Sequence, residues 1–227
     1  ATDTNLYFAI SRVQLNTIDN SSGDALYTDF TNVSTTLSKD TNYSLTITPQ
    51  YNISTTYNLG YSVWIDYNRD GDFEDTDEQV FTTGPVSGNA AKSGNFTVPS
   101  NVATGNARMR VALKYNDIPD SCETFTYGEV EDYTIYLFNG LLYSNSIWTP
   151  NFPTDLTGSE DVMILDGAYN TSVDIAVNNI TVASGATFNI SKENAVTVNG
   201  NISNNGEFIM NSDSNEFSSL LLSGSAS

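Results

Sequence analysis

Oxygen-bearing side chains recur at every second position of an acidic segment in the first half of the chain. Counted from Asp66, they occupy positions 1, 3, 5 and 7, with glycine at 6 and acids at 12 and 13: Asp66, Asn68, Asp70, Asp72, Asp77 and Glu78. A hard divalent cation takes about six to eight oxygen ligands, which this spacing can supply. The segment therefore predicts a Ca²⁺ site. The first three side chains would each bind through one oxygen, Asp72 through its carbonyl or carboxylate, and Asp77 or Glu78 would close the far side.

The residues around this segment favour strands rather than helices. Tyr61–Asp66 before it and Gln79–Phe81 after it contain aromatic and β-branched residues, which favour extended backbone. The site is therefore predicted to brace a connection between two strands rather than to move a pair of helices. Magnesium suits so flexible a loop less well, because it demands near-octahedral geometry. The alternative is a solvated acidic turn without a metal ion.

A second acidic group consists of Glu129, Glu131 and Asp132. Arg108 and Arg110 stand two residues apart, so on a strand they point to one face. If they lie opposite the acidic strand, these arginines would form cross-strand ion pairs with it. The alternative is that one of the acids supplies a second metal site or completes the first.

Aromatic side chains offer a different chemistry, because their flat faces can stack on sugar rings. The candidates are Tyr27, Tyr57, Trp64, Tyr115 and Tyr127. Strands also bury such rings, so a place in the core is the alternative for each of them. Binding of a sulfated glycan would require the basic residues to gather in one groove: Arg12, Lys39, Arg69, Lys92 and Lys114.

Short strands must position all of these residues. Up to about residue 138, alternation such as that of Met109, Val111 and Leu113 indicates about seven strands separated by turn residues. Residues 1–138 are therefore predicted to form an all-β, antiparallel, jelly-roll-like β-sandwich.

The texture of the sequence changes from residue 139. Four-residue strand phrases recur at intervals of about 8 to 12 residues with Asn or Gly between them, which is typical of stacked coils. Residues 139–227 are predicted to form a short β-solenoid or β-roll, and a second β-sandwich is the alternative. Because an apolar strand and a small-residue turn precede Ser227, we expect this domain to continue beyond that residue.

The charge balance excludes several classes of partner. Only 8 Lys and Arg stand against 27 Asp and Glu, a net charge of −19, so the chain has no basic patch to neutralise the phosphates of a nucleic acid. Adsorption to anionic lipid is disfavoured for the same reason. No apolar stretch is long enough to span a bilayer, so membrane insertion is not expected.

The composition also argues against catalysis. Histidine is absent and Cys122 is the single cysteine, which excludes a Ser–His–Asp triad, a Cys–His pair and a disulfide within the chain. A pair of carboxylates could hydrolyse a glycoside, but the two acidic groups above already have structural explanations. We therefore expect that the chain is not an enzyme.

The phrase Tyr127-Gly-Glu-Val-Glu-Asp-Tyr133 resembles the signature of the GEVED domain family, a module of secreted proteins from Bacteroidetes-type bacteria. Companion phrases follow the family's order at residues 27–31, 64–73, 96–99 and 105–111. The resemblance covers about Asn5 to Leu137 and implies an extracellular β-sandwich accessory domain, found beside peptidases, glycoside hydrolases and adhesive repeats. Family members usually carry a cysteine near their start, which implies a partner for Cys122 upstream of Ala1.

The region from Trp148 onward is similar to the β-repeats of proteins exported by the type IX secretion system, as in Ile180–Gly185 and Val196–Asn201. Together, the two resemblances imply a non-catalytic accessory module of a multimodular protein, secreted or held at the cell surface. We expect it to bind extracellular polysaccharide on a calcium-stabilised β-sandwich. The alternative is a spacer or adhesion module that, with other domains of the same polypeptide, projects a partner from the cell surface.

Overall fold

The computed structural model describes residues 7–150 and 156–226. The first six residues of the predicted sandwich, residues 151–155 of the predicted repeat region and Ser227 lie outside the described residues. The chain divides into two compact units, Ala1–Leu137 and Phe138–Ser227. Strands are the only regular secondary structure in the described part. No helix there is long and apolar enough to cross a membrane.

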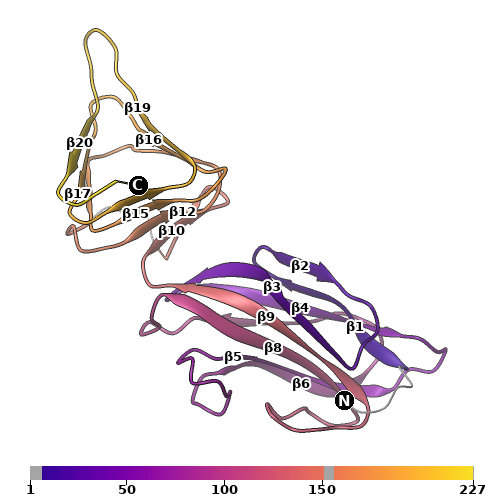
Figure 1. Ribbon diagram of the computed structural model, residues 1–227. Coiled ribbons are helices and arrows are strands. Elements are labelled where there is room, and N and C mark those ends of the chain that lie inside the picture. Colours follow the sequence, from indigo (N-terminus) through magenta and orange to yellow (C-terminus); the bar gives the residue numbers. More distant parts are fainter. Residues whose placement is uncertain (1–6, 151–155, 227) are drawn as a thin grey trace. The chain divides into compact units, whose positions relative to one another are not determined.

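The first unit consists of two sheets that enclose one core (Figure 1). The strand order is β2-β1-β4-β7 in one sheet and β3-β9-β8-β5-β6 in the other. The strands are β1 (Phe8–Leu15), β2 (Ile18–Ser21), β3 (Tyr27–Ser38), β4 (Asn42–Tyr51), β5 (Asn58–Ile65), β6 (Gln79–Ser87), β7 (Lys92–Thr97), β8 (Gly105–Tyr115) and β9 (Gly128–Phe138).

Alternation along the strands fills the space between these two sheets. Met109, Val111 and Leu113 of β8 are fully buried, as are Leu45 and Ile47 of β4 in the facing sheet. Each such side chain contributes about 1.5–3 kcal/mol when it leaves water. This packing fixes which face of β8 and β9 points inward, and it therefore decides where their polar residues lie.

The second unit is a parallel β-solenoid, whose three sheets form the sides of a coil (Figure 1). The sheet orders are β11-β10-β12-β15-β18, β13-β16-β19 and β14-β17-β20. The strands are β10 (Leu141–Ser144), β11 (Ile147–Thr149), β12 (Val162–Ile164), β13 (Ala168–Asn170), β14 (Ile175–Val177), β15 (Ile180–Val182), β16 (Thr187–Ile190), β17 (Ala195–Val198), β18 (Ile202–Asn204), β19 (Glu207–Met210) and β20 (Ser219–Leu222). Parallel pairing, as of β12 with β15, excludes a second sandwich. The predicted fold class, an all-β sandwich followed by a solenoid, is confirmed.

Successive coils of the solenoid place like residues above one another. Tyr169, Phe188 and Phe208 pair in register, and their ring centroids lie 5.7 Å and 5.0 Å apart. On the outer side of the same strands, Asn189 Nδ2 donates to Asn170 Oδ1 at 2.8 Å. The near-repeating sequence follows from this stacking, because each coil must cover the apolar column of its neighbour.

Phe188 lies in the middle of this column and is fully buried. Replacement by alanine leaves a cavity, so we predict that Phe188→Ala lowers the free energy of unfolding of the second unit by about 3–5 kcal/mol. Phe217 is 72% exposed and provides the matched control, since Phe217→Ala should change it by less than about 0.5 kcal/mol. Urea titration of the full chain, followed by hydrogen exchange of peptides from residues 156–226, measures both. Equal effects of the two substitutions would contradict the packing described.

Candidate functional site

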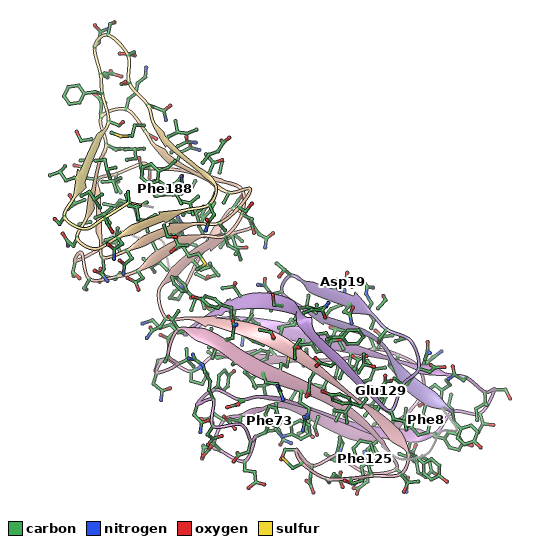
Figure 2. All side chains as sticks on the ribbon, in the orientation of Figure 1. Phe8, Asp19, Phe73, Phe125, Glu129 and Phe188 are labelled. Atoms are coloured by element: carbon green, nitrogen blue, oxygen red, sulfur yellow. The ribbon has the colours of Figure 1, made fainter. Side chains whose placement is uncertain are left out.

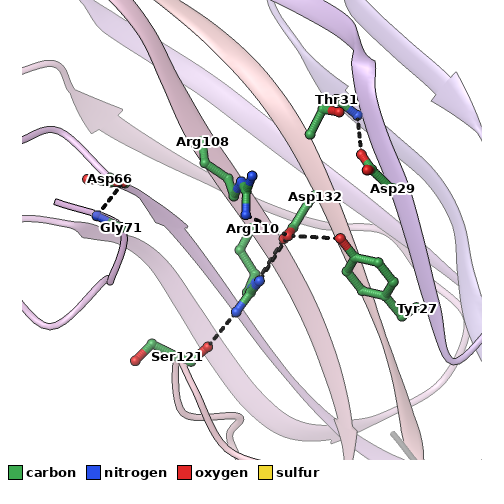
Figure 3. A network of polar contacts seen from close by, with 9 residues as sticks. All are labelled: Tyr27, Asp29, Thr31, Asp66, Gly71, Arg108, Arg110, Ser121 and Asp132. Carbon is green, nitrogen blue, oxygen red and sulfur yellow. Dashed lines mark hydrogen bonds and ion pairs between the residues drawn. The ribbon is translucent and has the colours of Figure 1, made fainter. Parts of the chain in front are cut away.

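The acidic loop between β5 and β6 is folded by hydrogen bonds to its first carboxylate. Asp66 is buried, and its Oδ1 accepts the backbone N–H of Arg69 at 2.6 Å while its Oδ2 accepts that of Gly71 at 3.2 Å (Figure 3). Gly71 has a φ of 98°, a conformation that side chains disfavour, which explains the glycine at loop position 6. Asp66 therefore uses both oxygens to shape the turn.

Three other carboxylates of this loop converge. One carboxylate oxygen from each of Asp70, Asp72 and Asp75 lies within 4.8 Å of the others. Asn68 Nδ2 donates to Asp70 at 2.9 Å and to Asp75 at 2.7 Å, which places the amide beside the group. The hydrogen bond from the backbone of Asp72, reinforced by Asn68, lowers the pKa of Asp70. Ionised carboxylates at such distances repel one another unless a cation lies among them.

The ligand atoms that this group offers suit a hard divalent cation, because all of them are carboxylate oxygens. The basic residue of the loop does not neutralise them, since the guanidinium of Arg69 donates to the carbonyls of Ala103 and Thr104. Among the predicted ligands, Asp70 and Asp72 meet here with Asn68 beside them. Asp75 stands at loop position 10 and was not predicted, because the helix-flanked spacing used as a template closes the site two positions later.

The two acids expected to close the site lie outside this group of three carboxylates. Glu78 is buried, and its Oε1 accepts the backbone N–H of Tyr67 at 2.9 Å while its Oε2 has no hydrogen-bond partner. Burial raises the pKa of Glu78. Asp77 is exposed and, with Tyr67 and Glu78, lines a cavity of about 280 Å³. Glu78 thus ties the end of the loop to its beginning, whereas Asp75 reaches the other carboxylates.

The same loop covers the outer face of the five-stranded sheet. Phe73 packs against Trp64 with ring centroids 6.5 Å apart, and both belong to a small core with Ala112. Trp64 is consequently only 2% exposed, so its predicted role in stacking on sugar is wrong. The alternation of side chains along β5 points Trp64 away from the core between the two sheets, but the acidic loop covers it on the outer face of the sheet.

Asp132 lies on that outer face in a charged network (Figure 3). It is opposite Arg110 in the β8–β9 register, and Arg110 binds it with two bonds, Nε to Oδ1 at 2.8 Å and Nη2 to Oδ2 at 2.9 Å. Arg108 approaches to 3.9 Å, and the hydroxyl of Tyr27 donates to Oδ2 at 3.2 Å. The side-chain hydrogen bond to Asp132 raises the pKa of Arg110. The pairing anticipated between the two strands is thus present at Asp132.

Glu129 and Glu131 do not join these arginines, which corrects the single cluster expected from the sequence. Successive residues of a strand point to opposite faces, so an acid one residue before Asp132 must face the other way. Both glutamates are fully buried on the core side of β9. The alternation of side chains along β9 could have separated Glu129 and Glu131 from Asp132, but the sequence prediction treated the three acids as one group.

Three of the predicted stacking residues meet in one pocket. Tyr57, Tyr115 and Tyr127 line a cavity of about 290 Å³ together with Tyr7 and Phe8. The ring of Tyr115 lies edge-on to those of Tyr57 at 5.4 Å and Tyr127 at 6.1 Å, and stacks on Phe8 at 6.1 Å. We call these five residues the tyrosine pocket.

The tyrosine pocket differs from the predicted set at four residues, of which the buried Trp64 is one. Tyr27 is 53% exposed but is not among the lining residues, because its hydroxyl is bound to Asp132. Tyr7 and Phe8 were missed, since their sequence surroundings resemble an ordinary strand start. Tyr115 and Tyr127 are 41% and 40% exposed, so their rings are open to solvent.

Comparisons with known proteins find a family model and several solved structures. Residues 60–136 match the family model of the GEVED domain, an interval that runs from β5 to β9 and includes the acidic loop. No curated protein matches. A family 123 glycoside hydrolase from Clostridium perfringens, studied for glycolipid glycan hydrolysis, shares 12% identity with a TM-score of 0.31, over 51% of this chain and 23% of its own. The chain therefore spans about a quarter of that enzyme's length.

The converging carboxylates predict that a divalent cation stabilises the first unit. Binding to the folded state alone adds about 2.7 kcal/mol when free Ca²⁺ is 100 times the Kd, so the Tm should rise with Ca²⁺ and fall with a chelator. The double substitution Asp70→Asn and Asp72→Asn should reduce this increase. Asp40→Asn, in an exposed turn with a φ of 54° that Asn tolerates, is the matched control and should retain it. A wild-type Tm indifferent to both Ca²⁺ and chelator contradicts the prediction.

The burial of Glu129 predicts a pH dependence for the metal-free protein. Burial raises the pKa of Glu129 from 4.5 to about 8, so the folded state holds this proton more tightly than the unfolded state. Its contribution to stability is fully present below about pH 4.5 and is lost as the pH rises towards about 8. In a chelator, the urea midpoint should therefore fall across this range, and Glu129→Gln should flatten the decline. Identical slopes for wild type and variant would show that Glu129 does not cause it.

Proposed function

We propose that the first unit is a non-catalytic carbohydrate-binding module of a larger extracellular protein. The observation that carries the proposal is the convergence of four tyrosines and Phe8 around one cavity of about 290 Å³. Aromatic rings stack on the apolar faces of sugars, and a tyrosine hydroxyl adds a polar group at the rim. The match of residues 60–136 to an accessory-module family supports the same proposal.

The size and lining of the tyrosine pocket limit what it can hold. Small-molecule sites usually have volumes of about 300–1,000 Å³, so this cavity suits one or two sugar residues at a time. Among the residues that the structure describes, those lining the pocket include no carboxylate, whereas glycoside hydrolysis uses a pair of them. The pocket therefore fits recognition rather than cleavage.

A neutral glycan fits better than a sulfated one. Three of the five basic residues that an anionic ligand would need are held in separate local contacts: Arg12 with Asp19, Lys114 with Asp117 and Glu123, and Arg69 with the carbonyls of Ala103 and Thr104. The net charge of −19 also repels sulfate. We therefore propose an uncharged polysaccharide as the ligand.

The second unit favours a supporting role in the same polypeptide. Its in-register parallel coils, such as Val162 on Ile180 on Ile202, form a continuous stack suited to a stiff spacer. We propose that it projects or spaces neighbouring domains at the cell surface, and export by the type IX system is consistent with this role.

The pocket proposal predicts which substitutions abolish glycan binding. In affinity electrophoresis against neutral and sulfated polysaccharides, the full chain should be retarded by a neutral polymer. Tyr115→Ala and Tyr127→Ala should each weaken binding about tenfold or more, which corresponds to about 1.4 kcal/mol. Phe217→Ala removes an aromatic ring that is 72% exposed outside the pocket and should leave binding unchanged. Retardation that persists in both tyrosine variants, or none for wild type with any polymer, would refute the proposal.

A further inference from the structure

Glu129 and Glu131 form a second acidic site that the tyrosine pocket and the acidic loop do not use. They stand two residues apart on β9, so both side chains lie on the face of that strand that is turned to the core of the first unit. Figure 2 labels Glu129 on this strand. Each is 0% exposed. Their cross-strand neighbours on β8 are apolar, Leu113 beside Glu129 and Val111 beside Glu131.

Each glutamate has one oxygen with a partner and one without. Glu129 Oε2 accepts the backbone N–H of Ile10 at 2.6 Å, and Glu131 Oε2 accepts the hydroxyl of Tyr133 at 2.8 Å. Oε1 of each residue is buried without a hydrogen-bond partner. A buried polar oxygen left unpaired is costly, and an ordered water or an ion is the usual partner of such an atom.

No basic side chain in the described part of the chain supplies that partner. The nearest arginines in the β8–β9 register, Arg108 and Arg110, lie on the opposite face with Asp132. Arg12 of the facing sheet is paired with Asp19. Two carboxylates on one face of β9 therefore lie in the core without a basic partner among the described residues.

The surroundings add oxygen atoms and further negative charge. Burial, together with the nearby charges of Glu131 and Asp24, raises the pKa of Glu129. The hydroxyls of Tyr133 and Ser22 lie beside Glu131, and the backbone N–H of Ala25 lies beside Glu129, so each carboxylate has a further hydrogen-bond donor close to it. Asp24 belongs to the exposed connection between β2 and β3. The side-chain ligand atoms here are all oxygens, which suits Ca²⁺ or another hard divalent cation.

We propose that Glu129 and Glu131 bind a divalent cation between the two sheets through their unpartnered oxygens. The ion would join β9 to the sheet that carries β1, because Glu129 already contacts Ile10. This site is separate from the proposed site in the acidic loop, which begins directly after Ile65 at the end of β5. The proposal does not depend on glycan binding.

The test counts ions bound to the full chain and uses the two sites as controls for each other. Isothermal titration with Ca²⁺ and metal analysis after gel filtration should find one bound ion fewer in Glu129→Gln with Glu131→Gln than in wild type. The variant Asp70→Asn with Asp72→Asn should still bind one ion. In that background, Tb³⁺ should luminesce on tyrosine excitation, because the Tyr133 hydroxyl touches Glu131.

Two results would overturn the proposal. The first is an unchanged ion count in the double glutamine variant, together with equal or greater stability, because the glutamates would then be a protonated pair. The second is a loop variant that binds neither Ca²⁺ nor Tb³⁺. This second measurement decides the matter even if the double glutamine variant fails to fold.

Discussion

A carboxylate removed from water must be paired with a cation, bound by donors or protonated, and the first unit is built around that constraint. Its buried acids are Asp66, Glu78, Glu129, Glu131 and Asp132. Asp66 is bound by backbone N–H groups, and Asp132 by a two-bond contact with Arg110. The others each retain an unpartnered oxygen. These unpartnered oxygens, with the converging carboxylates of the acidic loop, are the places where we propose that cations bind.

The strand that carries three of these acids also positions the tyrosine pocket. A Cβ on Gly128 would lie 2.1 Å from the carbonyl oxygen of Leu113, so only glycine lets β9 approach β8 so closely. The backbone N–H of Tyr115 donates to the carbonyl of Tyr127 at 3.1 Å just before that glycine. The two exposed rings are thus held side by side by the same strand pair whose outer face carries the Arg110–Asp132 ion pair.

Local pattern was sufficient to predict much of this structure. Alternation at Met109, Val111 and Leu113 predicted a core-facing strand, and the recurring Asn- and Gly-flanked phrases predicted a solenoid because stacked coils impose them. The tyrosine pocket was not predictable as a unit. Phe8 and Tyr127 are brought together only by the packing of two sheets, which no local pattern encodes. Asp75 was missed and Trp64 misassigned for a related reason, since both depend on how the loop folds back over the sheet.

The most direct test of the account is an anomalous difference map from crystals in which Ca²⁺ has been exchanged for Mn²⁺ or Tb³⁺. The account predicts one peak among Asp70, Asp72 and Asp75 and a second between Glu129 and Glu131. A map of well-ordered crystals with no peak at either place would contradict the claim that bound cations neutralise the carboxylates of this domain.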